Sequence, residues 1–374
     1  MSPLLLLTMA AALLPLAGCE RTPEVRVETE IPVVQDVDPE AKRVLVVINK
    51  ASQDSVAVGG YYVAKRKVPR SNVAMIDVPT ADNILPAQYK SGIEAPIQEA
   101  IKKSGHSIDF IVLTKGVPLR LQDGGGPSVD GQLAAMNLKL TYIGKLDPKT
   151  GEDQIKKSLN PYYQAKERFT SKKFGGMYLV TRLDAYTLTE AKRLVDLSLA
   201  AKPDKGPFFF DASPGHTGGG YGETQKTLFA AQALLKSRGF ETTLDETGPF
   251  VAPPDPLMGY ASWGSNDGSF NLDTYRKLRF KPGALAETFV STSGRTFTPT
   301  TGGQSLIADL VTQGVTGVKG YVSEPFTFAL AQPDILFDRY VSGFNLAESF
   351  YAASLVTYWK DIVIGDPLCR PYAK

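Results

Sequence analysis

Uninterrupted apolar runs alternate with helical patterns along most of the chain. The run 44–49 is apolar at nearly every position, which is typical of a strand buried on both faces of a parallel sheet. The pattern then predicts a helix over 54–67, a strand over 73–78, a helix over 87–104 and a strand over 110–113. This β-α-β-α-β order predicts a doubly wound sheet with right-handed crossovers.

The alternation of strand and helix patterns stops over 122–176. This segment begins with glycines and then becomes rich in lysine and polar residues. This segment is too long for a simple connection, so we expect an insertion over one end of the sheet. The alternation resumes afterwards. The elements expected there are 177–180, 189–201, 207–211, 225–238, 257–262, 287–291, 305–313, 317–322, 335–353 and 361–364. We therefore expect residues 44–374 to form one α/β domain, a doubly wound α/β/α sandwich with a mostly parallel sheet.

The apolar run at 4–18 has a different character, because it carries no charge and is followed by no strand or helix pattern. At about 15 residues it is too short to span a bilayer, which takes about 20, but it has the length of a signal-peptide core. It ends in Leu-Ala-Gly before Cys19, which resembles the bacterial lipobox, although no Lys or Arg precedes the run. We expect residues 1–18 to be removed and Cys19 to carry a lipid anchor.

Residues 19–43 are rich in Pro, Glu and Val without a helical or strand period, so we expect a tether that lifts the domain off the membrane. In Gram-negative lipoproteins an Asp after the lipidated cysteine often holds the protein at the inner membrane. Glu20 stands at that position and favours the periplasmic face of the outer membrane. The sequence thus predicts an exported, membrane-anchored protein.

The composition argues against nucleic-acid binding, a disulfide framework and a zinc site. Lys+Arg total 41 against 39 Asp+Glu, so nothing suggests the basic patch that nucleic-acid binding requires. If Cys19 is lipidated, Cys369 is alone and no disulfide framework exists. The only histidines are His106 and His216, and no cluster has zinc-ligand spacing. We expect no cofactor and no metal centre, although sites made of carboxylates alone stay open.

The loops after the strands are where an open α/β sheet places its ligands. Two of them gather indole, hydroxyl, amide and charged groups, and successive strand ends should bring both to one rim. Their candidate residues are Trp263, Ser265, Asn266, Asp267, Ser293 and Arg295. The same residue types also make tight turns, helix caps and anion nests, so purely structural roles stay open.

Four more candidates lie elsewhere. Lys115 and Arg120 follow the strand 110–113 and could lend positive charge to a site, and Asp130 lies in the insertion. His216 stands in a glycine-rich loop that lacks the Gly-Lys-Ser/Thr of a phosphate loop. A surface turn is the alternative for each. No Gly-x-Ser-x-Gly nucleophile elbow surrounds the candidate serines.

The mature chain resembles an uncharacterised family of exported bacterial proteins that occurs in genomes carrying exosortase and PEP-CTERM sorting. This resemblance implies an accessory role linked to exopolysaccharide or protein sorting at the cell envelope, and no established activity. The stretches that carry it are 44–49, 55–72, 113–121, 128–130, 260–267, 314–325 and the closing Gly-Asp-Pro-Leu at 365–368.

A more distant resemblance is to the gingipain-like cysteine peptidases, which have the caspase-like α/β/α fold. Val-Thr-Arg-Leu at 180–183 is similar to their Gly-Arg-Ile/Leu-Pro segment, and Tyr-Ala-Ser-Trp-Gly-Ser at 260–265 to the strand end that supplies the catalytic His. Segment 289–294 is similar to the strand end that supplies the Cys. Segments 314–320 and 363–367 match the later strands in the same order.

The departures from that pattern decide function. Trp263 stands at the His position, and Thr292 or Ser293 stands at the Cys position. Cysteine peptidase chemistry needs a thiolate beside an imidazole, and neither group is there. The resemblance therefore implies a peptidase scaffold that has lost or exchanged its dyad.

Three functions follow from these observations. The first is a binding or accessory protein of the envelope, whose cleft, floored by Trp263, holds a peptide, a glycan or an envelope protein. The second is a hydrolase with Ser293 or Ser265 as nucleophile and Asp267, Asp130 or His216 as base. The third is a structural lipoprotein without a small ligand. A base within about 3.2 Å of either serine would favour the enzyme, and its absence the binding protein.

Overall fold

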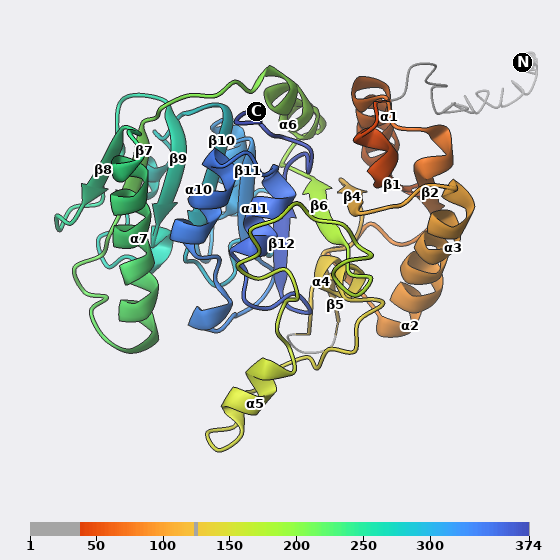
Figure 1. The fold of residues 1–374 in the computed structure, drawn as a ribbon, viewed down its shortest axis with the longest axis horizontal. Coiled ribbons are helices and arrows are strands. Elements are labelled where there is room, and N and C mark those ends of the chain that lie inside the picture. Colours follow the sequence, from red (N-terminus) through yellow and green to blue (C-terminus); the bar gives the residue numbers. More distant parts are fainter. Residues whose placement is uncertain (1–37, 123–125, 374) are drawn as a thin grey trace, which may run out of the picture. The chain divides into compact units, whose positions relative to one another are not determined.

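A computed structural model describes residues 38–122 and 126–373. Their fold is built on one ten-stranded sheet that lies between two layers of helices (Figure 1). In spatial order the strands are β2 (Val73–Ile76), β1 (Val44–Asn49), β4 (Phe110–Thr114), β6 (Leu179–Leu183), β12 (Asp361–Ile364), β11 (Gly317–Tyr321), β10 (Phe280–Thr288), β9 (Leu257–Ser262), β7 (Phe208–Asp211) and β8 (Thr242–Asp245). A second, small sheet pairs β3 (Asn83–Ile84) with β5 (Arg120–Leu121).

Strand β12 lies between two groups of parallel strands, which form the two halves of the sheet: β2, β1, β4 and β6 on one side, and β11, β10, β9, β7 and β8 on the other. β12 is antiparallel to β11, where Tyr321 pairs with Asp361, and it contacts β6 through one pair, Ile364 beside Arg182. The pairs on either side are parallel. Arg120, after β4, donates to Arg295 O, after β10, at 2.5 Å, and Lys115 and Asp184 share a hollow with Phe297. The carboxyl ends of β4, β6 and β10 therefore lie at the same edge of the sheet. The mostly parallel, doubly wound sheet is confirmed, but the sequence did not predict that β12 is antiparallel to β11.

Helices cover both faces of the sheet. On one face α1 (Gln53–Arg66) contacts α6 (Leu188–Ala200), which contacts α9 (Ile307–Thr312); on the other, α10 (Pro333–Val341) contacts both α7 (Gly219–Ser237) and α11 (Leu346–Ala352). Strand β11 shows why both layers pack closely. A Cβ on Gly317 would lie 2.4 Å from Leu346 of α11, and one on Gly320 would lie 2.6 Å from Ile307 of α9, on the opposite face.

The expected helix over 87–104 is present but is not regular. It starts as α2 (Pro86–Tyr89), passes through a π-helical turn over Lys90–Glu94, and continues as α3 (Ala95–Ser104). The remaining α-helices of the described residues are α4 (Val129–Ala134), α5 (Gly151–Lys156) and α8 (Leu272–Tyr275).

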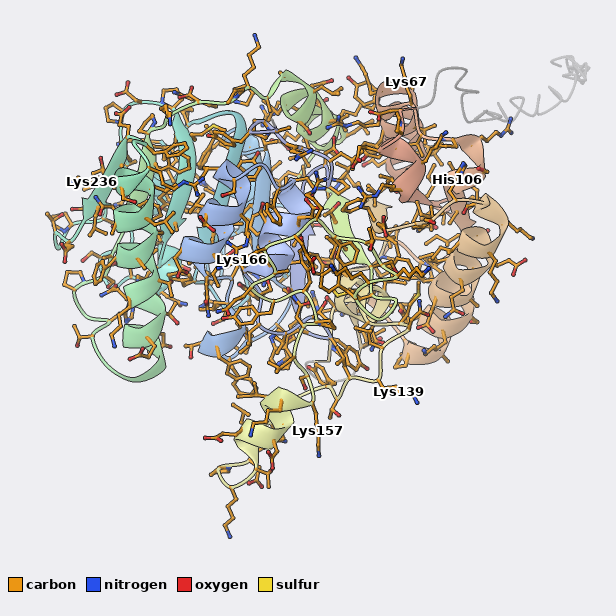
Figure 2. The ribbon with its side chains drawn as sticks, viewed as in Figure 1. Lys67, His106, Lys139, Lys157, Lys166 and Lys236 are labelled. Carbon is orange, nitrogen blue, oxygen red and sulfur yellow. The ribbon has the colours of Figure 1, made fainter. Side chains whose placement is uncertain are left out.

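The segment that the sequence marked as an insertion leaves the body of the fold and returns to it. Helix α4 packs against β6 and β12, whereas α5 projects away from the sheet and carries exposed lysines such as Lys157 (Figures 1 and 2). Asn160 fixes the returning chain, because its amide donates to Tyr351 O at 2.8 Å and to Ser354 O at 2.9 Å. Arg168 then binds the buried Glu348 at 2.7 Å.

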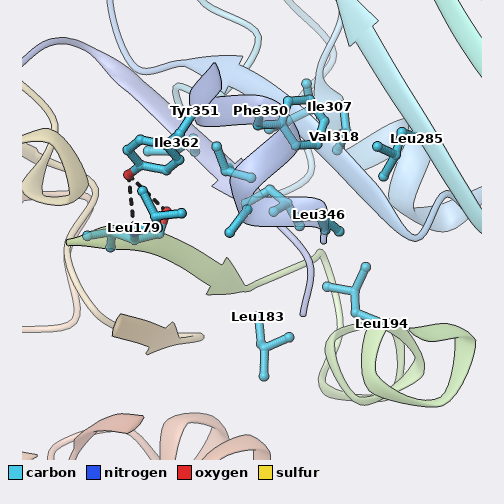
Figure 3. Packing of buried hydrophobic residues seen from close by; sticks show 14 of the residues in the cluster. Leu179, Leu183, Leu194, Leu285, Ile307, Val318, Leu346, Phe350, Tyr351 and Ile362 are labelled. Atoms are coloured by element: carbon cyan, nitrogen blue, oxygen red, sulfur yellow. Dashed lines mark hydrogen bonds between the residues drawn. The ribbon is translucent and has the colours of Figure 1, made fainter. Parts of the chain in front are cut away.

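A large apolar core lies on both faces of the sheet, and a second, smaller cluster contains Ile143, Ala329, Val356 and Trp359. Every residue of β1, β9 and β11 is buried, which explains why these strands appear in the sequence as continuous apolar runs. At the junction of the two halves, Leu179 of β6, Leu285 of β10 and Leu346 of α11 belong to the same cluster (Figure 3). This rigid core fixes where the loops at the strand ends begin.

Two elements differ from the expectations. β10 starts at Phe280, not at residue 287, because Phe280 already pairs with Leu257 before a register shift that spans Gly283, whose φ is 92°. The Pro-Gly pair inside this strand hides it from pattern analysis. β8 was not expected, since it is a short, half-exposed edge strand with little apolar character.

Candidate functional site

The loops after β9 and β10 begin side by side at one edge of the sheet, as the sequence predicted. Ser262 and Thr288 are register partners at the ends of the two strands. The amide of Asn266 donates to Phe289 O at 2.5 Å, and the amide of Gln304 donates to Asn266 Oδ1 at 2.9 Å. Asn266 therefore ties the loops to each other.

Trp263 lies in the core and does not floor an open cleft, because it is only 1% exposed. Its indole N–H donates to Gln225 Oε1 of α7 at 2.8 Å, and its ring packs edge-on against Phe289 at 5.0 Å between centroids. A buried indole whose N–H is bonded is a structural element of the rim. Its expected role as a ligand-binding residue stays a prediction, which in this conformation has to act through the residues that cover the ring.

His216 covers the indole from the solvent side. The two rings lie 4.1 Å apart, and His216 also stacks nearly parallel on Tyr221, at 4.9 Å and 17°. Because its partner is a carbonyl oxygen, Nε2 of His216 must be the donor in its 2.9 Å bond to Asn266 O. Tyr221 is 48% exposed. The three rings thus form an aromatic platform with one face open to solvent.

A pocket of about 410 Å³ opens beside this platform, between the end of β7 and the first turns of α7. His216 and Gln225 line it together with Thr217, Lys226 and Glu246. Gln225 is buried and fixed, since its Oε1 also accepts from Ser213 N at 2.8 Å. Phe229 is a second aromatic residue of the lining. A concave site with aromatic and several polar groups has the character of a small-ligand or segment-binding site.

Ser265 and Ser293 have no base beside them. Ser265 Oγ accepts from Ser305 N at 2.9 Å and lies 3.1 Å from Ser305 Oγ. Ser293 is fully buried, and its Oγ makes no hydrogen bond in the described part of the chain. No imidazole or carboxylate hydrogen-bonds to either hydroxyl among residues 38–122 and 126–373, so neither serine is activated as a nucleophile in this conformation.

Three carboxylates gather next to the pocket. Asp211 and Asp245 are neighbours on β7 and β8, and Asp267 follows β9. Burial raises the pKa of Asp211 to about 8, and the charges of Asp267 and Asp245 add to this effect. Asp267 also accepts from Ser269 N at 2.6 Å, as expected of a turn residue. Within the described ranges, no set of three or more His, Cys, Asp or Glu residues is arranged to hold a metal ion.

Arg295 stabilises its own loop. Its guanidinium donates to Gln304 O at 2.8 Å and to Gly302 O at 2.7 Å, so it closes the long segment between β10 and α9. Arg120 reaches this loop from the other half of the molecule and donates to Arg295 O at 2.5 Å. Both cations therefore use backbone carbonyls as partners.

Lys115 and Asp130 are separate from the rim at Trp263. Lys115 follows β4 and pairs with Asp184 at 3.3 Å, in a hollow that it lines with Phe297 from the segment after β10. Asp130 is 1% exposed and accepts from Arg182, whose Nε lies 2.9 and 2.8 Å from the two carboxylate oxygens. The remaining donors of Arg182 bind Val117 O and Pro118 O.

Of the two cysteines, the structure describes Cys369. Cys19 lies outside the described residues. Cys369 is buried beside Tyr340, with the hydroxyl 3.4 Å from Sγ, and burial raises the pKa of its thiol to about 11. Such a thiol is protonated at neutral pH and is a poor nucleophile.

Sequence analysis missed Tyr221 and Gln225. Tyr221 stands at the end of the run of glycines, where no pattern distinguished it, and Gln225 was read as the start of a helix that actually begins at Gly219. A signal was nevertheless present: at 225 a polar residue occupies a position that the helix buries, and buried polar groups require a partner.

Comparison with known proteins gives a fold and no family. No family model and no curated protein matches the chain. A solved structure of a protease is similar to it at a TM-score of 0.50 and 13% sequence identity, over 90% of this chain and 80% of that one. The separase–securin complex of Saccharomyces cerevisiae matches at a TM-score of 0.35 and 10% identity, over 50% of this chain and 14% of that one.

The likeness to the protease extends along nearly the whole chain and shows that the two proteins share an α/β fold. At 13% identity it does not transfer a reaction. In the part of the chain that the structure describes, no helix has the length and apolar character needed to cross a membrane.

Proposed function

We propose that this protein is a binding or accessory protein of the cell envelope that uses a peptidase-like scaffold without peptidase chemistry. It holds a segment of peptide or glycan in the pocket between β7 and α7. The observation that carries the proposal is the platform of His216, Tyr221 and Trp263 at the pocket, together with serines that lack a base.

The pocket suits a ligand with a flat apolar face and a polar rim. An aromatic ring buries a large area at a low entropic cost, and a half-exposed Tyr221 stacked on His216 offers such a surface. Lys226 and Glu246 bring opposite charges to the same hollow, and Thr217 and Gln225 bring a hydroxyl and an amide. A peptide backbone or a sugar ring presents the complementary donors and acceptors.

A hydrolase that uses Ser265 or Ser293 has less support. Ser265 is bonded to Ser305, Ser293 is sealed in the core, and the Nε2–H of His216 is already donated to Asn266 O. Activation would require both a new rotamer of His216 and an opening of the loop after β10.

Arrays of peptides and of bacterial glycans, probed with the folded domain, test this proposal. We expect wild type to bind a restricted set of features, and His216→Ala to lose them. His106→Ala is the matched control, because His106 lies beside α3 in the other half of the molecule and binds Asn72 (Figure 2). Equal binding by wild type and His216→Ala, or turnover of any array feature, would contradict the proposal.

Localisation rests on the sequence alone. We propose that the chain is exported, lipidated on Cys19 and held at the periplasmic face of the outer membrane, in the context of exopolysaccharide or protein sorting. Cys19→Ser should abolish uptake of labelled palmitate and release the protein from membranes. If the mutant still takes up label and sediments with membranes, Cys19 does not carry the lipid anchor.

A further inference from the structure

A second hollow lies on the face of the sheet covered by α6 and α9, and three arginines line it. Arg193 comes from α6, and Arg276 and Arg279 come from the segment after α8. The hollow has a volume of about 440 Å³, and its other lining residues are Asp309, Thr312 and Gln313. None of these residues lines the pocket beside His216.

Positive charge exceeds negative charge in this hollow. Asp309 is its single carboxylate, and it lies 3.5 Å from Arg276. Arg193 and Arg279 have no carboxylate within ion-pair distance among the described residues. Like charges that converge on a partly enclosed space repel one another, and this repulsion is relieved when an anion enters.

The arginines are held in place by the protein. Nη2 of Arg193 donates to Val311 O at 2.6 Å and to Thr312 O at 2.9 Å, where α9 ends. Nη1 of Arg279 donates to Arg276 O at 2.9 Å and to Leu278 O at 2.7 Å. These contacts use one nitrogen of each guanidinium and leave other N–H donors for a ligand.

Unpartnered polar atoms add a second, independent sign of a ligand. Nε of Arg193 and both the oxygen and the nitrogen of the Gln313 amide are buried and make no hydrogen bond in the described part of the chain. Both residues line the hollow. Buried donors and acceptors without partners are rare in folded proteins and mark places where a partner binds.

We propose that this hollow binds a small phosphate- or sulfate-bearing molecule. A guanidinium group offers parallel N–H donors that match two oxygens of a tetrahedral oxyanion, and three such groups exceed what one carboxylate can accept. The Gln313 amide can bond to a hydroxyl or carbonyl next to the anion. The volume is that of a small-ligand site. This inference does not depend on the function proposed for the His216 pocket.

Calorimetric titration of the folded domain with inorganic phosphate and with sulfate at low ionic strength tests the proposal. The variant is Arg276→Gln/Arg279→Gln, since both side chains are exposed and their loss leaves the core intact. Lys277→Gln is the matched control, because it removes an exposed charge from the same segment without lining the hollow. We expect the double variant to bind at least tenfold more weakly and the control to stay within about twofold of wild type.

Equal binding by wild type and the double variant would overturn the site. An equal loss in Lys277→Gln would do the same, because it would show diffuse attraction, and so would the absence of heat with both anions. Glycerol 1-phosphate and vesicles containing phosphatidic acid then distinguish a free ester from a lipid headgroup. Arginine-dependent binding of either supports the proposal, whereas binding of inorganic phosphate alone contradicts it.

Discussion

The polar side chains at the strand ends differ between the two halves of the sheet in their partners and their exposure to solvent. At the end of β6, the guanidinium of Arg182 binds Asp130 and two backbone carbonyls and is fully buried, out of reach of a ligand. At the end of β7, His216 and Tyr221 keep one side toward solvent next to a pocket. Although both halves are parallel and flanked by helices, the first half stabilises the fold and the second offers a binding surface. Motif residues after a strand therefore do not identify a site until their partners are known.

The largest effect is expected when the buried ion pair between Arg182 and Asp130 in the first half is removed. Arg182→Ala leaves the carboxylate of Asp130 buried without its partner, which typically lowers the free energy of unfolding by about 3–5 kcal/mol. Urea unfolding measures the loss. The control is Lys50→Ala, whose partner Asp77 lies 3.6 Å away in an exposed pair and should contribute less than about 1 kcal/mol. If Arg182→Ala unfolds like the control, the first half does not have the structural role assigned to it.

Trp263→Ala tests whether the second half also contains residues that stabilise the fold. Because the indole is buried against Phe289 and bonded to Gln225, its removal should lower the free energy of unfolding by about 3 kcal/mol. Tyr221→Ala, at the exposed end of the same platform, is the control and should change it by less than about 0.5 kcal/mol. Equal stabilities of wild type and Trp263→Ala would show that the indole is a surface anchor after all.

The carboxylates beside the pocket make a pH-dependent prediction. The pKa of Asp211 is about 8 in the folded protein against an ordinary value of 3.8, so below pH 3.8 the group is protonated in both states. Between the two values the folded state keeps a proton that the unfolded state has released. Stability therefore falls as the pH rises through this window.

Asp211→Asn should remove that part of the decline. Urea unfolding at pH 5 and pH 9 should show a smaller loss for the variant than for wild type, while the exposed Asp77→Asn keeps the wild-type loss. The buried Glu287, whose pKa burial raises to about 8, contributes equally to all three proteins and cancels. Identical losses in wild type and Asp211→Asn would mean that Asp211 is ionised at neutral pH.

The sequence predicted the strands of the sheet well because burial on both faces leaves an unmistakable apolar run, as in β1 and β9. It could not predict the direction of β12, since an apolar run is the same in either orientation. The burial of the indole was also invisible, because its partner Gln225 lies 38 residues away in the chain. Tyr221 was missed because a glycine-rich loop has no period from which exposure can be inferred.

The central claim is that the pocket at the end of β7 binds a ligand through its aromatic platform. The most direct measurement is calorimetric titration of the best peptide or glycan from the arrays into wild type, Tyr221→Ala and His216→Ala, with His106→Ala as control. We predict that each platform variant binds at least tenfold more weakly, a change of about 1.4 kcal/mol, while its melting temperature stays close to that of wild type. Unchanged affinity in both platform variants would contradict the account.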